Sequence, residues 1–434
     1  MRASAQRGAC VAIAAVAIAL GPGCARAPEP PPARLGAPAP REDGWISASD
    51  PAASSPVGAA APQTPAEVAR GKDFADEVRA LYRVVACAGS DPVPADLDPR
   101  VVIEHCAKLT PKIEGYRRRY LAVAAPFLAA LVPPNDGARV VYPFGGGDLV
   151  TAITAYPKAR EYTTLSLELV GDPRRIRGLP SDALAVSLAK LRSELDELIF
   201  VDDYSRSETL KRTQRGEIPG ELAFFLVGLA IHDLKPISLR YFRVEADGAA
   251  RYLTQDDIDA TDHDVAERRK RSWMPPDFSE AFANAEIGFV GASDPPSATP
   301  RVHRHLAANL ANSELSKNPG VLRHLEQKGP VLAMTKAASY LLWSGGFSYV
   351  RDYLLDHMTF MVSDSTGIPP SFAARAGFAQ ETYGTFTRSL LFADQADNAA
   401  FRKLWGTSTK RALPFRFGYR DASGHDHLVV TKKP

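Results

Sequence analysis

Residues 139–148 read RVVYPFGGGD, and this stretch decides the fold class. The mainly apolar run at 139–144 predicts a buried strand, because it is short, rich in branched and aromatic residues and followed by turn residues. Three consecutive glycines at 145–147 predict a tight turn, since glycine adopts backbone angles that other residues avoid. Asp148 suits the start of a helix that ends before Pro157.

The alternation of strands and helices continues on both sides of this stretch. Further strands are predicted at 162–169, 237–244, 250–253, 287–290, 302–306, 331–334 and 360–362. Further helices are predicted at 66–86, from Thr110-Pro111 onward, and at 181–198, 221–231, 336–343 and 347–357. Residues 254–280 are charged and are interpreted as a loop. Such alternation favours a sheet with parallel strands and helices on its faces.

The end of the chain carries two short strand patterns, 415–420 and 425–431, around a turn at 421–424. They predict a C-terminal β-hairpin. We therefore expect an α/β fold with a mixed or largely parallel sheet that is flanked by helices and ends in this hairpin.

The first 24 residues have the pattern of an export signal. Arg2 and Arg7 supply positive charge, residues 9–20 (ACVAIAAVAIAL) are apolar, and small residues follow. This apolar run is shorter than the ~20 residues that a membrane-spanning helix needs. We expect residues 1–24 to be a signal peptide that directs export and is removed.

The residues before Cys24 resemble the lipobox of bacterial lipoproteins, in which a small residue precedes a cysteine that becomes the lipid-bearing N-terminus. Gly23 and Cys24 fit this pattern, whereas Leu20 lies one position earlier than the pattern asks. The resemblance implies lipidation of Cys24, a membrane partner through the lipid anchor, and a place in the bacterial cell envelope on its periplasmic or surface face. Ordinary cleavage after residues 25–27 (ARA) is the alternative.

Composition divides the remaining chain into two parts. Residues 25–65 are rich in alanine, proline and serine, and predict a disordered tether. Residues 66–434 predict an α/β globular domain, and a division into two lobes near 255–285 is left open. The chain is 45% hydrophobic and 24% charged, as in ordinary globular proteins. A net charge of +2 gives no support for nucleic-acid binding.

Four cysteines bear on the compartment. Cys10 lies in the predicted signal and Cys24 at the predicted lipidation site, which leaves Cys87 and Cys106 in the globular domain. A pair of cysteines in an exported domain predicts a disulfide. Two buried free thiols are the alternative.

The glycine turn is the strongest candidate for a ligand site. Gly145, Gly146 and Gly147 follow a strand, and Glu168 ends the next strand about 20 residues later, as in nucleotide-binding sheets. The glycines lack the Gly-x-Gly-x-x-Gly spacing, so a tight strand-to-helix turn is the alternative and we expect no cofactor. A small-molecule ligand at this strand end is still expected, because α/β sheets bind ligands at the carboxyl ends of their strands.

Two further patterns could carry chemistry. His303 with His305, and His425 with His427, each place two imidazoles on one face of a strand, and two converging pairs would form a metal site. Lys336 and Ser339 would share a face of the helix predicted at 336–343, where a neutral lysine could activate the serine.

Several motifs together resemble those of an uncharacterised family of exported bacterial proteins. They are YPFGGGD at 142–148, LE at 167–168, KAASYL at 336–341, DSTGIP at 364–369 and YGTFT at 383–387. The resemblance covers roughly residues 139–392 and implies kinship without an activity, and members often have proline where this chain has Gly146-Gly147. It implies that one pocket gathers Tyr142, Asp148, Glu168, Lys336, Ser339, Asp364 and Tyr383.

These observations leave three interpretations. The leading one is an envelope lipoprotein with a binding or structural role, whose partner is an envelope protein or a small molecule. The second is an extracytoplasmic hydrolase that uses Asp148 or Glu168 as general base and Lys336 to stabilise charge. The third is a metal-binding envelope protein. The hydrolase requires Asp148, Glu168, Lys336 and Asp364 to lie within about 8 Å of one another in a cleft.

Overall fold

The computed structural model describes residues 71–201, 217–271, 279–295, 297–387, 395–407, 411–421 and 423–434. The predicted signal peptide at 1–24, the lipidation site Cys24 and the predicted tether at 25–65 lie outside these residues. Pro65–Pro434 form one compact unit. In the part of the chain that is described, no helix has the length and apolar character needed to cross a membrane.

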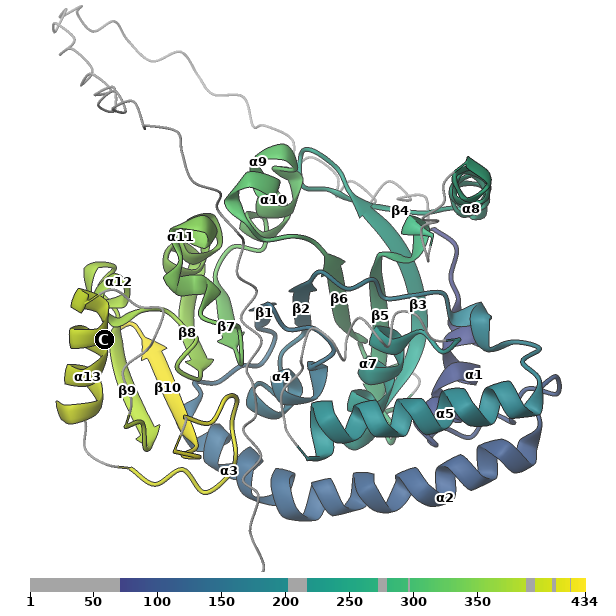
Figure 1. The fold of residues 1–434 in the computed structure, drawn as a ribbon, viewed down its shortest axis with the longest axis horizontal. Helices are drawn as coiled ribbons and strands as arrows, with labels where there is room; N and C mark the ends of the chain where they lie inside the picture. Colours follow the sequence, from purple (N-terminus) through teal and green to yellow (C-terminus); the bar gives the residue numbers. More distant parts are fainter. Residues whose placement is uncertain are drawn as a thin grey trace, which may run out of the picture. The chain divides into compact units, whose positions relative to one another are not determined.

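A ten-stranded mixed sheet runs through this unit in the order β4-β3-β5-β6-β2-β1-β7-β8-β10-β9 (Figure 1). The strands are β1 (Arg139–Pro143), β2 (Glu161–Ser166), β3 (Leu234–Val244), β4 (Ala250–Tyr252), β5 (Asn284–Gly291), β6 (Arg301–Ala307), β7 (Val331–Thr335), β8 (Met358–Ser363), β9 (Ala379–Gly384) and β10 (His427–Lys432). The predicted α/β class is confirmed.

Five neighbouring strands at the centre of the sheet are parallel. β6, β2, β1, β7 and β8 pair in parallel, while β3, β4 and β5 extend the β6 side in antiparallel pairs. In chain order the five strands stand third, second, first, fourth and fifth, as at the centre of doubly wound nucleotide-binding sheets. The direction of winding therefore reverses between β1 and β7, and this reversal is the topological switch point.

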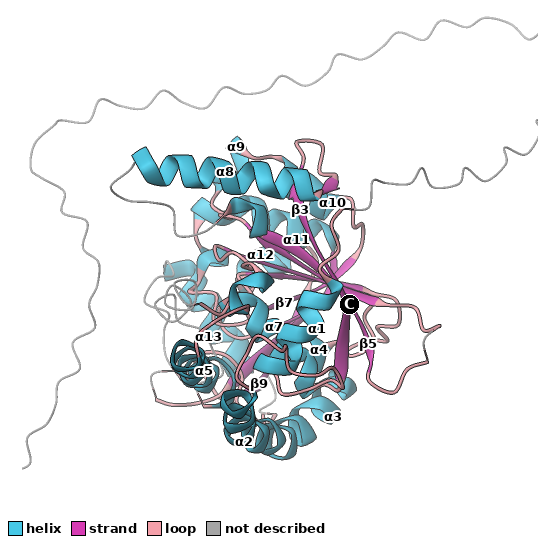
Figure 2. Ribbon diagram, turned by 90° about the vertical axis from the view of Figure 1, so that its right-hand side faces the viewer, coloured by secondary structure: helices cyan, strands magenta, loops and turns pink. Residues whose placement is uncertain are grey.

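Helices cover both faces of the sheet (Figure 2). One core includes α1 (Ala75–Val85), α2 (Pro99–Tyr116), α3 (Ala122–Leu131), α4 (Leu149–Ala155), α5 (Ser181–Leu195) and α7 (Gly220–Ile231). The core on the opposite face includes α9 (Asn312–Lys317), α10 (Gly320–Glu326), α11 (Ser348–His357) and α12 (Pro370–Arg375). Alternate strand residues supply the two cores: Tyr142 points to the first and Val141 to the second.

The N-terminal helices are tied by a disulfide between Cys87 and Cys106, whose Cα atoms are 5.3 Å apart. Helix α2 begins at Pro99, with Asp98 accepting a hydrogen bond from the backbone N–H of Arg100. The predicted start at Thr110-Pro111 was wrong, because this earlier aspartate and proline already form the cap and first turn. Pro111 lies inside the helix.

The predicted C-terminal strand pair is confirmed, with a different first strand. β10 pairs in antiparallel fashion with β9 and β8, not with residues 415–420. That segment is irregular, because Gly418 has a positive φ of 64° and the N–H of Tyr419 donates to Asp364 at 3.0 Å rather than to a strand. Phe415 and Phe417 are buried in the first core.

The charged segment predicted as a loop at 254–280 contains helix α8 (Gln255–Arg271). Its start is a reciprocal cap. The N–H of Asp257 donates to the Thr254 hydroxyl at 3.2 Å, and the N–H of Thr254 donates to the Asp257 carboxylate at 2.9 Å. This threonine-to-acid spacing is a recognised helix start that outweighs the low hydrophobicity of the segment.

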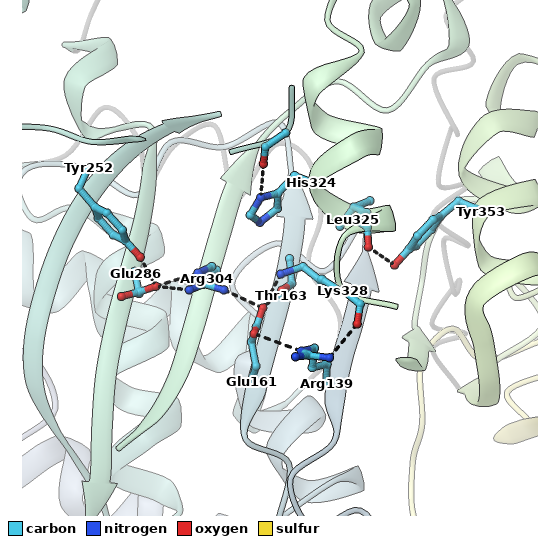
Figure 3. Close-up of polar contacts among 11 residues, drawn as sticks. Arg139, Glu161, Thr163, Tyr252, Glu286, Arg304, His324, Leu325, Lys328 and Tyr353 are labelled. Atoms are coloured by element: carbon cyan, nitrogen blue, oxygen red, sulfur yellow. Dashed lines mark hydrogen bonds and ion pairs between the residues drawn. The ribbon is translucent and has the colours of Figure 1, made fainter. Parts of the chain in front are cut away.

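The face that carries α10 also holds a chain of ion pairs, which we call the Glu161 network: Glu161, Arg304, Glu286, Lys328 and Tyr252 (Figure 3). Arg304 donates to Glu161 at 3.0 Å and to Glu286 at 2.7 Å. Lys328 also pairs with Glu161, and Tyr252 donates to Glu286 at 2.5 Å. Each carboxylate of this network therefore has at least one charged partner.

Candidate binding site

The loops that follow the parallel strands meet at one edge of the sheet, which we call the carboxyl edge. Asp148 follows β1, Glu168 follows β2, Lys336 and Ser339 follow β7, and Asp364 follows β8. Ligands of open α/β sheets bind at this edge and at the switch point. The topology thus places five of the predicted pocket residues in neighbouring loops.

Asp148 and Lys336 form a buried ion pair. The Lys336 ammonium lies 2.7 Å from one Asp148 oxygen, which also accepts from the Tyr142 hydroxyl at 3.0 Å. The other oxygen accepts from the hydroxyl of Thr151 at 2.6 Å, and Lys336 donates to that hydroxyl at 2.8 Å. The Lys336 and Asp148 side chains are only 2% and 5% exposed. Each charge is therefore balanced inside the protein rather than presented to a ligand.

Asp364 joins three loops of the carboxyl edge. One of its oxygens accepts from the N–H and the hydroxyl of Thr366, at 2.9 and 2.5 Å. Its other oxygen accepts from the N–H groups of Ala337 and Tyr419, at 2.9 and 3.0 Å. Four donors occupy this buried carboxylate, so its role is to position the loops.

The loop after β7 has a strained backbone. Ala337, Ser339 and Tyr340 have φ values of 55°, 51° and 59°, and Phe144 after β1 has a φ of 60°. Such angles are costly for residues other than glycine, and they concentrate at ligand sites. The predicted helix at 336–343 is therefore wrong, and only a 3₁₀ turn at Leu341–Trp343 is helical. The reason is that Asp364 and the Thr366 hydroxyl capture the N–H groups of Ala337 and Ala338.

The glycine turn fits its predicted role. Gly146 has a positive φ of 49°, which the turn requires. A Cβ atom at Gly147 would lie 2.6 Å from the Phe224 ring, so this glycine lets helix α7 approach the turn. Asp148 caps α4 by accepting from the N–H of Thr151 at 3.3 Å.

A cavity of about 140 Å³ opens between these loops, and we call it the switch-point cavity. Its walls come from the loops after β1, β2 and β7 and from one C-terminal residue. They are Phe144, Gly146, Ser166, Leu167, Glu168, Ala337, Ala338, Ser339, Leu341 and Tyr419. Three of the four strained residues, Phe144, Ala337 and Ser339, are among them.

Glu168 is held by a directed chain of hydrogen bonds. The Nε2 atom of His305 lies 2.9 Å from the Glu168 carbonyl oxygen, which can only accept, so Nε2 carries the proton. Nδ1 of His305 then accepts from the Thr164 hydroxyl at 2.9 Å, and that oxygen accepts from Nε2 of His303 at 2.9 Å. Burial lowers the pKa of His305 to about 4, which agrees with two neutral imidazoles.

A second acid, Glu221, lies in the first turn of α7 and is close enough to Glu168 to feel its charge. Its side chain is fully buried, and neither oxygen has a hydrogen-bond partner within the described residues. Burial, and then the charge of Glu168, raise the pKa of Glu221 well above its usual value. Burial therefore favours the protonated, uncharged form of Glu221.

The other predicted pocket residues lie differently. Ser339 is exposed, and its hydroxyl is 3.4 Å from that of Tyr419. Tyr383 lies in β9, does not line the switch-point cavity, and accepts from Arg411 at 2.6 Å while donating to Glu381 at 3.1 Å. The structure thus brings Gly146, Glu168 and Ser339 to one cavity, whereas Gly145 and Gly147 do not line it. Asp148, Lys336 and Asp364 support the loops around it.

The two histidine pairs lie on different strands. His303 and His305 belong to β6, whereas His427 begins β10, with β2, β1, β7 and β8 between them. His425 instead donates to the Asp421 carboxylate at 3.1 Å. Among the described residues, no group of three or more histidine, cysteine or acidic side chains has the geometry of a metal site.

Sequence reasoning missed Glu221, Ser166 and Tyr419. Glu221 could have been noticed in the sequence, because it is the one charged residue of the otherwise apolar α7 segment GELAFFLVGLAI. Tyr419 reaches the cavity through contacts between distant parts of the chain, such as the bond from its N–H to Asp364. The sequence around Tyr419 does not predict this position.

Comparisons of the whole chain with protein-family models, with curated proteins and with solved structures gave no match. Function must therefore be argued from the site itself.

Proposed function

We propose that this chain is an exported, lipid-anchored protein of the bacterial cell envelope whose α/β unit binds a small molecule in the switch-point cavity. One observation carries the binding function. A cavity with a strained backbone lies where the winding of the parallel sheet reverses, between the loops after β1 and β7. Open α/β sheets bind their ligands at such reversals.

Binding explains the charged groups of this edge better than hydrolysis. The hydrolase hypothesis needs Asp148 as base and Lys336 as charge stabiliser, but these groups neutralise each other in a buried pair. Asp364 is occupied by four donors. The remaining acid at the cavity is Glu168, whose backbone is held by Ser166 and His305. A single acid in this setting is suited to binding a ligand rather than to acid–base catalysis, which uses a pair of groups.

Export and anchoring are supported by the N-terminal sequence. The charged start, the apolar run at 9–20 and Gly23-Cys24 fit a lipoprotein signal. A disulfide between Cys87 and Cys106 agrees with an oxidising compartment.

Palmitate labelling with cell fractionation tests the anchor. We expect the wild type to carry the label and to sediment with membranes, and Cys24→Ala to lose both. Cys10→Ala is the matched control, because Cys10 lies within the signal that is removed. Label retained in Cys24→Ala would contradict the anchor without affecting the binding proposal.

A ligand-observed NMR screen of a small-molecule library tests the binding function. Ser339→Trp fills the mouth of the cavity from an exposed position, and Ser193→Trp places the same side chain at an exposed position of α5. We expect hits on the wild type that Ser193→Trp keeps and Ser339→Trp loses. A library without hits, or hits that Ser339→Trp retains, would contradict the proposal.

A further inference from the structure

The switch-point cavity has a chemical character that narrows its ligand. Glu168 is the one charged side chain among the described residues that line it. Phe144, Leu167 and Leu341 add apolar surface, and Ser166, Ser339 and Tyr419 add hydroxyls. An acid beside apolar walls attracts hydroxyl groups or a cation and repels an anion.

Lys336, which directly precedes the lining residues Ala337 and Ala338, does not change this balance. The Lys336 side chain is 2% exposed, its ammonium lies 2.7 Å from Asp148, and Lys336 is not among the residues that line the cavity, so its charge is balanced by Asp148. Sites for phosphate offer an unpaired lysine or arginine, or backbone N–H groups at a helix start. Here the carboxylate of Asp148 occupies the start of α4, which a phosphate would otherwise approach.

Glu168 is built to accept hydrogen bonds from a ligand. No described residue donates to its carboxylate, although its backbone is held on both sides. Its N–H donates to the Ser166 hydroxyl at 3.3 Å, and its carbonyl accepts from His305 at 2.9 Å. A fixed backbone leaves only the side-chain torsions of Glu168 to be ordered by a ligand, which lowers the entropy cost of binding.

Size and position limit the ligand further. About 140 Å³ is below the ~300–1,000 Å³ of sites for drug-sized molecules, so the cavity takes one small ring. Leu167 at the cavity is 67% exposed, so the remainder of a larger ligand would extend past it. In doubly wound sheets, an acid after the second strand accepts from the ribose hydroxyl.

We propose that the cavity binds a phosphate-free sugar ring through two neighbouring hydroxyls that donate to the Glu168 carboxylate. The ring belongs to a nucleoside or to a free sugar, since both carry the same diol. This inference rests on the proposed function and names its ligand class.

Calorimetric titration of the full chain tests the inference with four probes: adenosine, 2′-deoxyadenosine, adenosine 5′-monophosphate and methyl β-ribofuranoside. We expect adenosine or the riboside to bind and 2′-deoxyadenosine to bind at least about tenfold more weakly, because one hydrogen bond to a charged group is lost. We expect the monophosphate to bind more weakly than adenosine. If adenosine binds much more tightly than the riboside, the ligand is a nucleoside. If the two bind with equal affinity, the ligand is a free sugar.

Glu168→Gln should weaken the bound probe at least about tenfold, while Glu326→Gln, an exposed acid on α10, should leave it unchanged. Equal binding of the deoxynucleoside, tighter binding of the monophosphate, or failure of both diols would overturn the inference. If adenosine and the riboside do not bind, but other library compounds bind the wild type and not Ser339→Trp, the proposed ligand class is wrong and the binding function stands. If no compound is sensitive to Ser339→Trp, the binding function fails as well.

Discussion

A glutamate lies at or just beyond each end of strand β2, and the two acids differ in their partners. Glu161 begins the strand and is paired with Lys328 and Arg304 on the face that carries α10 (Figure 3). Glu168 follows the end of the strand, lines the switch-point cavity and lies near the buried acid Glu221, and no ion pair joins it to a cation among the described residues. The first arrangement favours stability, and the second leaves an acceptor for a ligand.

The carboxyl edge also contains a paired charge, and breaking it should have the largest effect. Asp148→Ala would remove the carboxylate that lies 2.7 Å from the buried Lys336 ammonium, and we expect a loss of about 3–5 kcal/mol in unfolding free energy. Urea denaturation measures it. The double variant Asp148→Leu with Lys336→Met should lose less than the single one, because both charges of the pair are replaced by apolar groups. A loss below about 1 kcal/mol for Asp148→Ala would mean that the pair does not support the edge.

The Glu161 network should matter nearly as much, with a definite pH dependence. Burial alone would raise the pKa of Glu161, but Lys328 and Arg304 outweigh it and lower the pKa from 4.5 to about 2. A lowered pKa stabilises the fold above pH 4.5, and the gain is lost as the pH falls toward 2. Glu161→Gln should therefore cost about 3 kcal/mol at pH 7 and progressively less below pH 4.5. A cost independent of pH would contradict the assignment.

Glu221 should behave in the opposite way to Glu161. Its raised pKa means that the folded state keeps a proton that the unfolded chain releases, so stability falls as the pH rises above 4.5. Glutamine at this position cannot release a proton, so we expect Glu221→Gln to remove this slope and to gain stability relative to the wild type as the pH rises above 4.5. Thermal unfolding at several pH values measures it. Identical slopes in both proteins would show that Glu221 is ionised in the fold.

The smallest expected effect concerns the strained loop at the cavity. Ala337 has a φ of 55°, so Ala337→Gly should raise stability by about 0.5–1 kcal/mol as the strain is relieved. Ala338→Gly is the matched control and should lower stability, because Ala338 itself has no positive φ to relieve and glycine only adds freedom to the unfolded chain. Equal effects of the two substitutions would argue against stored strain at this site.

The sequence predicted the parts of the fold that local chemistry dictates. The run RVVYPFGGGD gave β1, the turn and the start of α4, since branched residues, glycines and a capping aspartate act within a few positions. The strand predicted after this run also placed Glu168 near the end of the next strand, which ends at Ser166. The reciprocal cap at Thr254 and Asp257 was equally local, and its charged helix was overlooked.

The remainder depends on contacts between distant residues. KAASYL has good helix formers, yet Asp364 and Thr366, almost 30 positions later, hold its first N–H groups in another conformation. FRFGY alternates like a strand, yet the same Asp364 takes the N–H of Tyr419. The state of Glu221 follows from burial among elements that only the assembled fold brings together.

A crystal structure of the full chain with the tightest compound from the screen tests the central claim most directly. The account predicts that the compound occupies the switch-point cavity, with its hydroxyls on the Glu168 carboxylate and its ring against the loop at Ala337–Ser339. Occupancy elsewhere, for example in the groove beside Arg411 and His425, with the switch-point cavity empty, would contradict it.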